Sequence, residues 1–411
     1  MDLLYAASFP YLARRYREGF DERRGFYSKE FQDMVQGERP LWIHAVSVGE
    51  VQSSLPFISE IRKEDPLKPV ILSTITPTGK KMFDRLLNGK VDAHFYYPWD
   101  VSRIVNRALN TIQPEAYITL ETEIWPTLLS ELSKRGVPCF MVNGRFSDKS
   151  FEKMERFRFI WREVLCLYTL IMVREREDET KLLKLGVPRD KIVHTGDCKV
   201  DALLERRDHA RLEEVRKLTG PGKPIFLGGS THNGEDQVVL QAFDRVRRKI
   251  PSARLILVPR HPERAGAVRE LAEKYGRSCL LSGPLQDWSI LIVDRIGVLF
   301  ELYGICDGAF IGGSLVPKGG QNLMEAAAFG VPVTHGPHME DFAEASKRMG
   351  ELGISSLVTK PDDLSEEWLR TSDPGVREKI SSRCIDFFSE LGGAASSSWK
   401  LIREHMDKGG K

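Results

Sequence analysis

The 411-residue sequence lacks the cysteine and charge patterns of several protein classes. Its six cysteines form no Cys-x-x-Cys pair, and no His/Cys cluster has the spacing of zinc ligands. Sixty basic and 58 acidic residues leave a net charge of +2, so the whole chain has no electrostatic reason to bind nucleic acid. We therefore expect reduced, mostly buried thiols in a cytosolic protein, no structural metal and no nucleic-acid partner.

Several nucleotide-binding motifs are also missing. No Gly-x-Gly-x-x-Gly follows the first predicted strand, which removes the usual dinucleotide fingerprint. No Asp-x-Asp occurs, so a metal-chelated nucleotide diphosphate is poorly supported. Residues 74–81 contain the Gly-Lys of a P-loop, but Thr74 replaces its first glycine and Lys81 its Ser/Thr, so we exclude an ATP site there.

The chain has no long apolar run at its amino end. Residues 1–12 are apolar but far shorter than the roughly 20 residues that span a bilayer, and Pro10 interrupts them. Basic residues follow this stretch, unlike in a signal peptide. Residues 1–31 then have two interpretations: a peripheral contact with an anionic membrane surface, or a helix packed on its own domain. Both interpretations rest on the same basic and aromatic residues: Arg14, Arg15, Arg17, Arg23 and Arg24, mixed with Tyr16, Phe20, Phe26 and Tyr27.

Short apolar, β-branched runs alternate with helical patterns along the whole chain. This alternation predicts an α/β fold of two doubly wound, Rossmann-like domains, whose parallel sheets face a central cleft. The runs span residues 41–48, 69–75, 116–120, 138–142 and 170–173 in the first half, and residues 224–229, 254–258, 289–293, 308–311 and 331–334 in the second.

A charged stretch and a Thr-Gly-Pro-Gly-Lys-Pro segment at residues 203–224 separate the two sets of runs. We therefore expect a first domain at residues 32–205 and a second at residues 222–390. The segment 391–411 contains a Gly392-Gly393 break, and a terminal helix from about Gly393 to His405 is expected to pack back on the first domain.

Carboxylates follow two predicted strands of the first half. Glu50 comes just after Gly49, and either acts as a general base or caps the next helix with its negative charge. Glu121 and Glu123 repeat the arrangement, and one is expected to orient substrate while the other makes a structural pair. Lys199 either stabilises negative charge on a substrate or pairs with Asp197 or Asp201 at the surface.

The second half holds features typical of anion and nucleotide binding. A double-glycine loop at residues 312–325 leads into an alanine-rich helix with Asn322 and Glu325 in its first turn. This loop is either a phosphate cradle, with Glu325 suited to ribose hydroxyls, or a turn that merely starts a packed helix. Arg260, between two prolines, suits a phosphate or carboxylate, and Gly297 offers backbone groups to a base or ribose.

In their order along the chain these residues resemble the Kdo transferases of lipopolysaccharide assembly, which move 3-deoxy-D-manno-octulosonic acid (Kdo) from CMP-Kdo to a lipid A precursor. The resemblance covers nearly the whole chain. It rests on Ser47-Val-Gly-Glu50, Thr76-Pro-Thr-Gly79, Glu121-Thr-Glu-Ile-Trp-Pro126, Ser230-Thr-His232, Val258-Pro-Arg-His-Pro-Glu-Arg264, Gly312-Gly-Ser-Leu315, and Asn322 with Glu325.

The resemblance implies an inverting GT-B glycosyltransferase, with the acceptor (lipid IVA) on the first domain and CMP-Kdo on the second. Glu50 is then the general base, and Glu121 and Lys199 stabilise the transition state. No metal or other cofactor is implied, because the leaving group is already a phosphate monoester. The CMP contacts implied are Pro259, Arg260, Ile296, Gly297, Val298, Asn322, Leu323, Met324 and Glu325.

Two departures from the family pattern limit what carries over. Val298 stands where family members usually have an acidic residue, so only backbone contacts are implied there. The amino-terminal apolar stretch is shorter than the family's membrane anchor, which implies peripheral attachment at the cytoplasmic face of the inner membrane. Two alternative functions stay open: another GT-B sugar-nucleotide enzyme, and a non-catalytic nucleotide-sugar binding protein.

Overall fold

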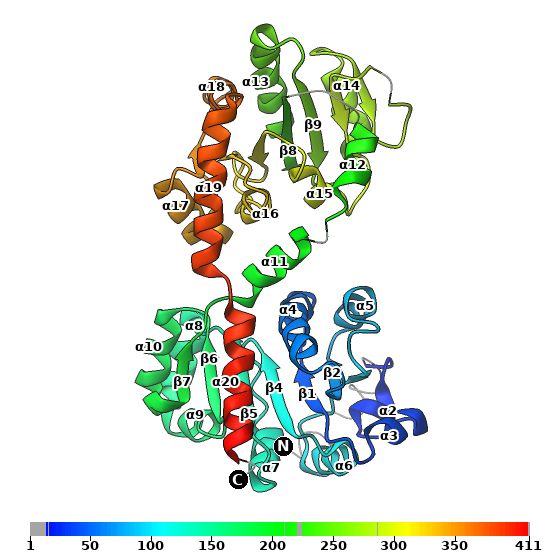
Figure 1. The fold of residues 1–411 in the computed structure, drawn as a ribbon, viewed down its shortest axis with the longest axis vertical. Helices are drawn as coiled ribbons and strands as arrows, with labels where there is room; N and C mark the ends of the chain where they lie inside the picture. Colours follow the sequence, from blue (N-terminus) through cyan, green and yellow to red (C-terminus); the bar gives the residue numbers. More distant parts are fainter. Residues whose placement is uncertain (1–13, 15, 209, 220–223, 286, 410–411) are drawn as a thin grey trace. The chain divides into compact units, whose positions relative to one another are not determined.

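The computed structural model describes residues 14, 16–208, 210–219, 224–285 and 287–409. The chain divides into two compact units, each with its own sheet (Figure 1). Residues 1–202 and 391–411 belong to the first unit, and residues 203–390 belong to the second.

The first unit is built on a seven-stranded parallel sheet in the order β3-β2-β1-β4-β5-β6-β7. Its inner strands are continuous apolar runs because helices cover both faces of the sheet. The strands are β1 (Leu41–His44), β2 (Val70–Thr74), β3 (Ala93–Tyr96), β4 (Ala116–Leu120), β5 (Cys139–Gly144), β6 (Leu170–Val173) and β7 (Ile192–His194).

Helices alternate with these strands along the chain. They are α2 (Phe20–Arg23), α3 (Lys29–Val35), α4 (Val48–Glu64), α5 (Pro77–Leu86), α6 (Ser102–Ile112), α7 (Pro126–Lys134), α8 (Asp148–Arg156), α9 (Arg158–Leu165), α10 (Arg176–Leu185) and, at the end of the chain, α20 (Ala394–Gly409). The helix α11 (Cys198–Asp208) begins in this unit and crosses the division at residue 202.

The second unit repeats the plan with a sheet in the order β10-β11-β9-β8-β12-β13-β14. Its strands are β8 (Ile225–Thr231), β9 (Arg254–Pro259), β10 (Ser278–Leu280), β11 (Ile290–Ile292), β12 (Gly308–Ile311), β13 (Val333–His335) and β14 (Ser355–Leu357). Its helices are α12 (Leu212–Thr219), α13 (Glu235–Lys249), α14 (Ala265–Ala272), α15 (Leu299–Tyr303), α16 (Met324–Ala327), α17 (Ala343–Glu351), α18 (Pro361–Thr371) and α19 (Pro374–Leu391). The predicted class of two doubly wound α/β domains is confirmed.

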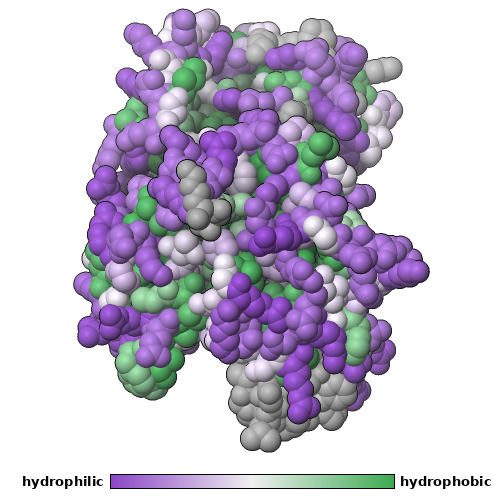
Figure 2. Space-filling model, turned by 60° about the horizontal axis from the view of Figure 1, so that its bottom comes forward, coloured by the Kyte–Doolittle hydropathy of each residue, from purple (hydrophilic) through white to green (hydrophobic). Residues whose placement is uncertain are grey.

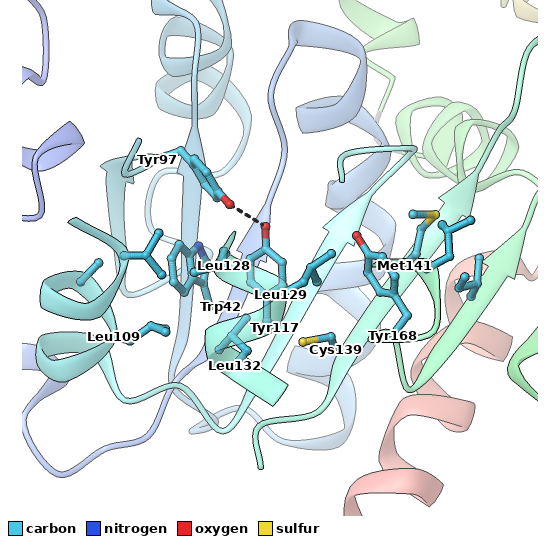
Figure 3. Packing of buried hydrophobic residues seen from close by; sticks show 14 of the residues in the cluster. Trp42, Tyr97, Leu109, Tyr117, Leu128, Leu129, Leu132, Cys139, Met141 and Tyr168 are labelled. Atoms are coloured by element: carbon cyan, nitrogen blue, oxygen red, sulfur yellow. Dashed lines mark hydrogen bonds between the residues drawn. The ribbon is translucent and has the colours of Figure 1, made fainter. Parts of the chain in front are cut away.

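Most of the surface in view in Figure 2 is hydrophilic, and the apolar side chains are concentrated inside. Figure 3 shows one face of the first sheet, where Trp42, Tyr117 and Tyr168 pack among leucines of α6 and α7. The hydroxyl groups of Tyr97 and Tyr117 lie 3.5 Å apart there. Large aromatic side chains supply much of the burial that holds this face together.

The first unit extends further toward the amino end than the expected boundary at residue 32. Tyr27 and Phe31 lie in its core, and the buried Arg23 donates a 2.6 Å hydrogen bond to the backbone oxygen of Ile75. For these residues the packing interpretation is therefore the correct one. The apolar run at residues 1–12 and Arg15 lie outside the described residues.

The helix α20 packs on the first unit, although almost 200 residues separate it from the rest of that unit in the sequence. Ala394, Trp399 and Ile402 are buried against the second face of the sheet. The Asp201 carboxylate accepts hydrogen bonds from the backbone N–H groups of Gly393 (2.6 Å) and Ala395 (2.7 Å), at the start of the helix. Among the described residues, no helix is both long and apolar enough to cross a membrane.

Candidate active site

In the first sheet the direction of strand addition reverses between β1 and β4. The strands β2 and β3 lie on one side of β1, while β4 to β7 lie on the other. Loops that leave the carboxyl ends of two such strands diverge, and this crevice is where doubly wound folds bind ligands. Glu50 follows β1 and Glu121 follows β4, so both lie at this reversal.

Glu50 is held in place by two hydrogen bonds from its own loop. It lies in the first turn of α4 and is 6% exposed. Its Oε2 accepts from the backbone N–H of Val46 (2.7 Å), and its Oε1 accepts from the Ser47 hydroxyl (2.8 Å). A carboxylate has about four acceptor positions, so capping this turn leaves acceptor capacity for a substrate hydroxyl. Burial raises the pKa of Glu50, the two hydrogen bonds oppose that effect, and the charge of Glu121 adds to it.

The Thr-Pro-Thr-Gly segment rejected as a P-loop supports the loop that carries Glu50. Thr76 caps α5, since its hydroxyl accepts from the N–H of Gly79 (2.9 Å) and donates to the oxygen of Val46 (3.1 Å). A Cβ at Gly79 would lie 2.8 Å from that same oxygen. Glycine is therefore required where α5 meets the Glu50 loop.

Glu121 and Lys199 form an ion pair. The Lys199 Nζ lies 2.6 Å from the Glu121 Oε1. The alternative partners of Lys199 are engaged elsewhere, because Asp197 pairs with Arg174 and Asp201 accepts from the start of α20. Glu121 has a φ of 59°, which is uncommon for a residue with a side chain and typical of strained functional positions.

Glu123 is the residue of this site for which sequence analysis predicted no definite role. Burial raises its pKa to about 8, and the charges of Glu50 and Glu121 add to the effect. Glu123 is therefore mostly protonated at neutral pH, while Glu121 makes the ion pair. The sequence signal that could have found it is the Glu-x-Glu spacing itself, since one of two clustered carboxylates is forced to keep its proton.

The second sheet has its own reversal, between β8 and β12. The strands β9, β11 and β10 lie on one side of β8, and β12 to β14 lie on the other. The predicted CMP contacts lie at the ends of three strands of this sheet: Pro259 ends β9 and Arg260 follows it, Ile296 to Val298 follow β11, and Asn322 to Glu325 follow β12. They therefore gather along the carboxyl edge of one sheet.

The double-glycine loop does not offer its first N–H groups to a ligand, which corrects the phosphate-cradle interpretation. Glu235 is fully buried, and its Oε2 accepts from Gly313 N (2.7 Å) and His232 N (2.8 Å). Its Oε1 accepts from Ser314 N (3.0 Å) and Leu315 N (2.9 Å). The anion that this loop binds is thus a carboxylate of the chain itself.

The helix after the double-glycine loop begins later than expected, so Asn322 lies before it and not in its first turn. The helix α16 covers only Met324–Ala327, and Asn322 precedes it, with its side-chain oxygen accepting from Met324 N (3.1 Å). Leu323 is fully buried, so only its backbone can reach a ligand. Glu325 lies 3.5 Å from Arg206, and burial raises its pKa.

The arginines of the Pro-Arg-His-Pro-Glu-Arg motif differ in exposure. Arg260 is exposed at the end of β9. Arg264 instead donates to the oxygen of Thr231 (2.9 Å) and pairs with the buried Asp236. Ile296 is 86% exposed, and Gly297 has a φ of 93° with open space around it.

His232 is a second candidate, for which sequence analysis predicted no role. Its Nε2 is buried without a hydrogen-bond partner among the described residues, and its ring lies 6.0 Å from that of His261. Burial lowers the pKa of His232, which therefore favours a neutral ring. A buried, unpartnered ring nitrogen next to the Gly313 loop is placed to contact a ligand.

Comparisons with known proteins give the family. A model described as "3-Deoxy-D-manno-octulosonic-acid transferase (kdotransferase)" matches residues 18–202. The 3-deoxy-D-manno-octulosonic acid transferase of Haemophilus influenzae is 31% identical over 402 residues, which are 96% of this chain and 93% of that protein. The chain belongs to the Kdo transferase family. A Bordetella pertussis transferase of the same name is 30% identical over 383 residues, 89% of this chain and 87% of the relative.

This membership confirms the resemblance and the predicted enzyme class, a glycosyltransferase. Among solved structures, UDP-GlcNAc 2-epimerase from Neisseria meningitidis bound to UDP-GlcNAc has a TM-score of 0.62 at 14% identity, over 90% of this chain and all of that chain. At that identity the likeness shows only that the Kdo transferase chain has the GT-B-like fold. The roles of the individual site residues stay predictions.

No three or more His, Cys, Asp or Glu side chains in the described part of the chain gather so as to hold a metal ion. The expectation of a reaction without metal or other cofactor stays a prediction.

Proposed function

We propose that this chain transfers Kdo from CMP-Kdo to a lipid A precursor, lipid IVA, with inversion at the anomeric carbon. The observation that carries the proposal is the buried Glu50 carboxylate at the strand reversal of the first unit, in electrostatic contact with Glu121. In a member of the Kdo transferase family, such a group suits the removal of a proton from an acceptor hydroxyl.

In the proposed reaction Glu50 accepts the proton of the acceptor hydroxyl as its oxygen bonds to the anomeric carbon of Kdo. The bond from that carbon to the phosphate oxygen of CMP breaks, and CMP leaves with the electron pair. Burial raises the pKa of Glu50, which makes it a stronger base than an exposed glutamate. A single displacement of this kind inverts the anomeric centre.

The Glu121–Lys199 pair supplies a fixed charge arrangement next to the base. The pair is preformed at 2.6 Å, so no reorganisation is needed when charge develops on the reacting sugar. A protonated Glu123 adds a hydrogen-bond donor without a third negative charge beside Glu50 and Glu121. Both features favour an oxocarbenium-like transition state that carries the carboxylate of Kdo.

We assign CMP binding to the second unit. Arg260 is the exposed cation for the phosphate, and the backbone at residues 296–298 and the side chains of Asn322 and Glu325 are assigned to the nucleoside. The unpartnered His232 ring joins Arg260 as a candidate phosphate contact, since the Gly313 loop itself already binds Glu235. A phosphate monoester as leaving group reduces the need for a metal.

Two alternative functions differ from this one in what they require of Glu50. Another sugar-nucleotide enzyme with this fold needs the second unit but not the particular set of Glu50, Glu121 and Lys199. A non-catalytic nucleotide-sugar binding protein tolerates the loss of Glu50. Family membership and the assembled first-unit set favour the transferase.

Because the proposed acceptor is a lipid, we place the enzyme at an anionic membrane surface, as a peripheral protein on the cytoplasmic face of the inner membrane. The exposed Arg14 and Arg17 support this placement, while Arg23 is buried and does not. Arginines near anionic lipid headgroups favour surface binding.

The test is CMP release from CMP-Kdo by the purified chain, with and without lipid IVA, followed by mass analysis of the lipid. Acceptor-dependent CMP release with a lipid mass increase of one or more Kdo units supports the proposal. Binding of CMP-Kdo without transfer would favour the non-catalytic alternative, and epimerised or hydrolysed donor without a modified lipid would favour another sugar-nucleotide enzyme.

A further inference from the structure

The helices α8 and α9 expose apolar side chains that a protein core would normally bury. Phe157, Phe159 and Ile160 are 51%, 71% and 48% exposed. All residues from Glu155 to Ile160 are exposed. Three large apolar residues within four positions are more than the scattered single exposures of an ordinary surface. We call Arg156, Phe157, Arg158, Phe159 and Ile160 the α9 patch.

The helix α9 points these side chains outward because its inner face is already packed. Trp161, Val164 and Leu165 pack against the core of the first unit. Successive residues of an α-helix are about 100° apart, so Phe159 lies about 200° from Trp161. Rotation of the helix about its axis cannot bury both faces, and no element among the described residues of this unit covers the outer face of α9.

The basic charge of this segment is concentrated among its aromatic residues. Residues 156–162 read Arg-Phe-Arg-Phe-Ile-Trp-Arg, with three arginines and no acidic residue. Arg162 donates to the oxygen of Gly186 (3.1 Å) and so faces the protein. Arg156 and Arg158 are exposed on the same segment as the apolar side chains.

We infer that the α9 patch docks the first unit on the surface of an anionic lipid bilayer. Aromatic and aliphatic side chains enter the boundary between headgroups and acyl chains, while the arginines pair with lipid phosphates. A protein partner would also cover the apolar side chains. Alternating arginine and phenylalanine, with acids only at the flanking Glu155 and Glu163, matches a polyanionic, fluid surface better than a second copy of this near-neutral chain.

This inference rests on the membrane placement in the proposed function and deepens it, because it names a docking surface distinct from the amino-terminal segment. Docking itself requires no transfer. The patch comes from the helices after β5, whereas the membrane contact expected from the sequence lies in residues 1–31. Vesicle binding can therefore be measured without CMP-Kdo, and its result does not depend on transferase activity.

The experiment is co-sedimentation of the full chain with vesicles of phosphatidylcholine and phosphatidylglycerol, and with vesicles of phosphatidylcholine alone. We expect binding to the anionic vesicles, and a loss of about tenfold or more in the double variant Phe159→Ser/Ile160→Ser. We expect a similar loss in Arg156→Gln/Arg158→Gln, with a weaker dependence of binding on salt. The matched control is Leu67→Ser, since Leu67 is 91% exposed but isolated on a loop of the same unit, and its binding should not change.

Circular dichroism and transfer to detergent-dispersed lipid IVA check that the variants are folded, since both should match the unmodified chain. Unchanged vesicle binding by both double variants would overturn the inference. A shift of the patch variants from dimer to monomer in sedimentation, without a change in vesicle binding, would overturn it as well and assign the patch to a second copy of the chain.

Discussion

At the scale of the residue, Glu123 keeps a proton at neutral pH that an exposed glutamate would lose, because burial raises its pKa. Its pKa of about 8 follows from burial and from the charges of Glu50 and Glu121. A site with three close carboxylates avoids three negative charges in this way. The residue types and the Glu-x-Glu spacing were readable in the sequence. The sequence did not show which carboxylate keeps the proton, because that depends on the pairing of Glu121 with Lys199 in space.

This proton predicts how stability depends on pH. Between about pH 4.5 and pH 8 the unfolded chain releases the Glu123 proton while the folded chain keeps it, so stability falls as pH rises through this window. Glutamine resembles the protonated form and does not titrate. We expect the melting temperature of Glu123→Gln, relative to that of the unmodified chain, to increase as pH rises. The difference between the two free energies of unfolding should change by at most about 1.4 kcal/mol per pH unit.

Thermal unfolding followed by circular dichroism across this pH range measures the difference. The exposed Glu152→Gln serves as a control that should show no such trend. A Glu123→Gln difference that stays constant with pH would show that Glu123 is ionised in the folded protein.

At the scale of the element, all ten strands predicted from apolar runs are present, and four more strands exist. The additional strands, β3, β7, β10 and β14, are the two edges of each sheet. An edge strand is short and partly exposed, so it lacks the continuous apolar run that identifies an inner strand. The binding of the double-glycine loop to Glu235 was not predictable either. These hydrogen bonds join residues that are 78 to 80 positions apart in the sequence.

The Glu235 contacts predict a large effect of a small substitution. In Glu235→Gln one acceptor oxygen becomes an amide donor that faces backbone N–H groups, and the negative charge at the start of α13 is lost. We expect a loss of about 3–5 kcal/mol in the free energy of unfolding, as for a broken buried pair. Urea unfolding monitored by fluorescence measures it.

The matched control for this substitution is Asp244→Asn on the same helix, where an exposed pair with Arg248 should contribute about 1 kcal/mol or less. Equal unfolding midpoints for the two variants would mean that the Glu235 carboxylate does not hold the loop.

At the scale of the whole molecule, the last helix belongs to the unit with which the chain begins. A two-domain α/β fold with a separate terminal helix was predictable from the alternating runs and the Gly-Gly break. The depth of its packing was not predictable, because Trp399 contacts residues that lie 335 or more positions away in the sequence. Its ring meets that of Phe57 edge to face, and its Nε1 donates to Glu64 (2.8 Å).

Trp399→Ala should therefore destabilise the first unit by about 3–5 kcal/mol, because a nearly buried ring leaves a cavity. The exposed neighbour Lys400→Ala is the control and should have little effect. Hydrogen exchange that accelerates in the first sheet of Trp399→Ala, and not in the second, would match the expected result. Unchanged exchange in the first sheet would mean that α20 is dispensable for that unit.

The most direct test of the central claim is the turnover of Glu50→Gln with CMP-Kdo and lipid IVA. The account predicts a loss of about 10² to 10⁴ in the rate of acceptor-dependent CMP release, with CMP binding by the second unit unchanged in calorimetry. Glu60→Gln, on the same helix and paired with Lys63, should retain the full rate. Full turnover by a folded Glu50→Gln enzyme would contradict the assignment of Glu50 as the general base.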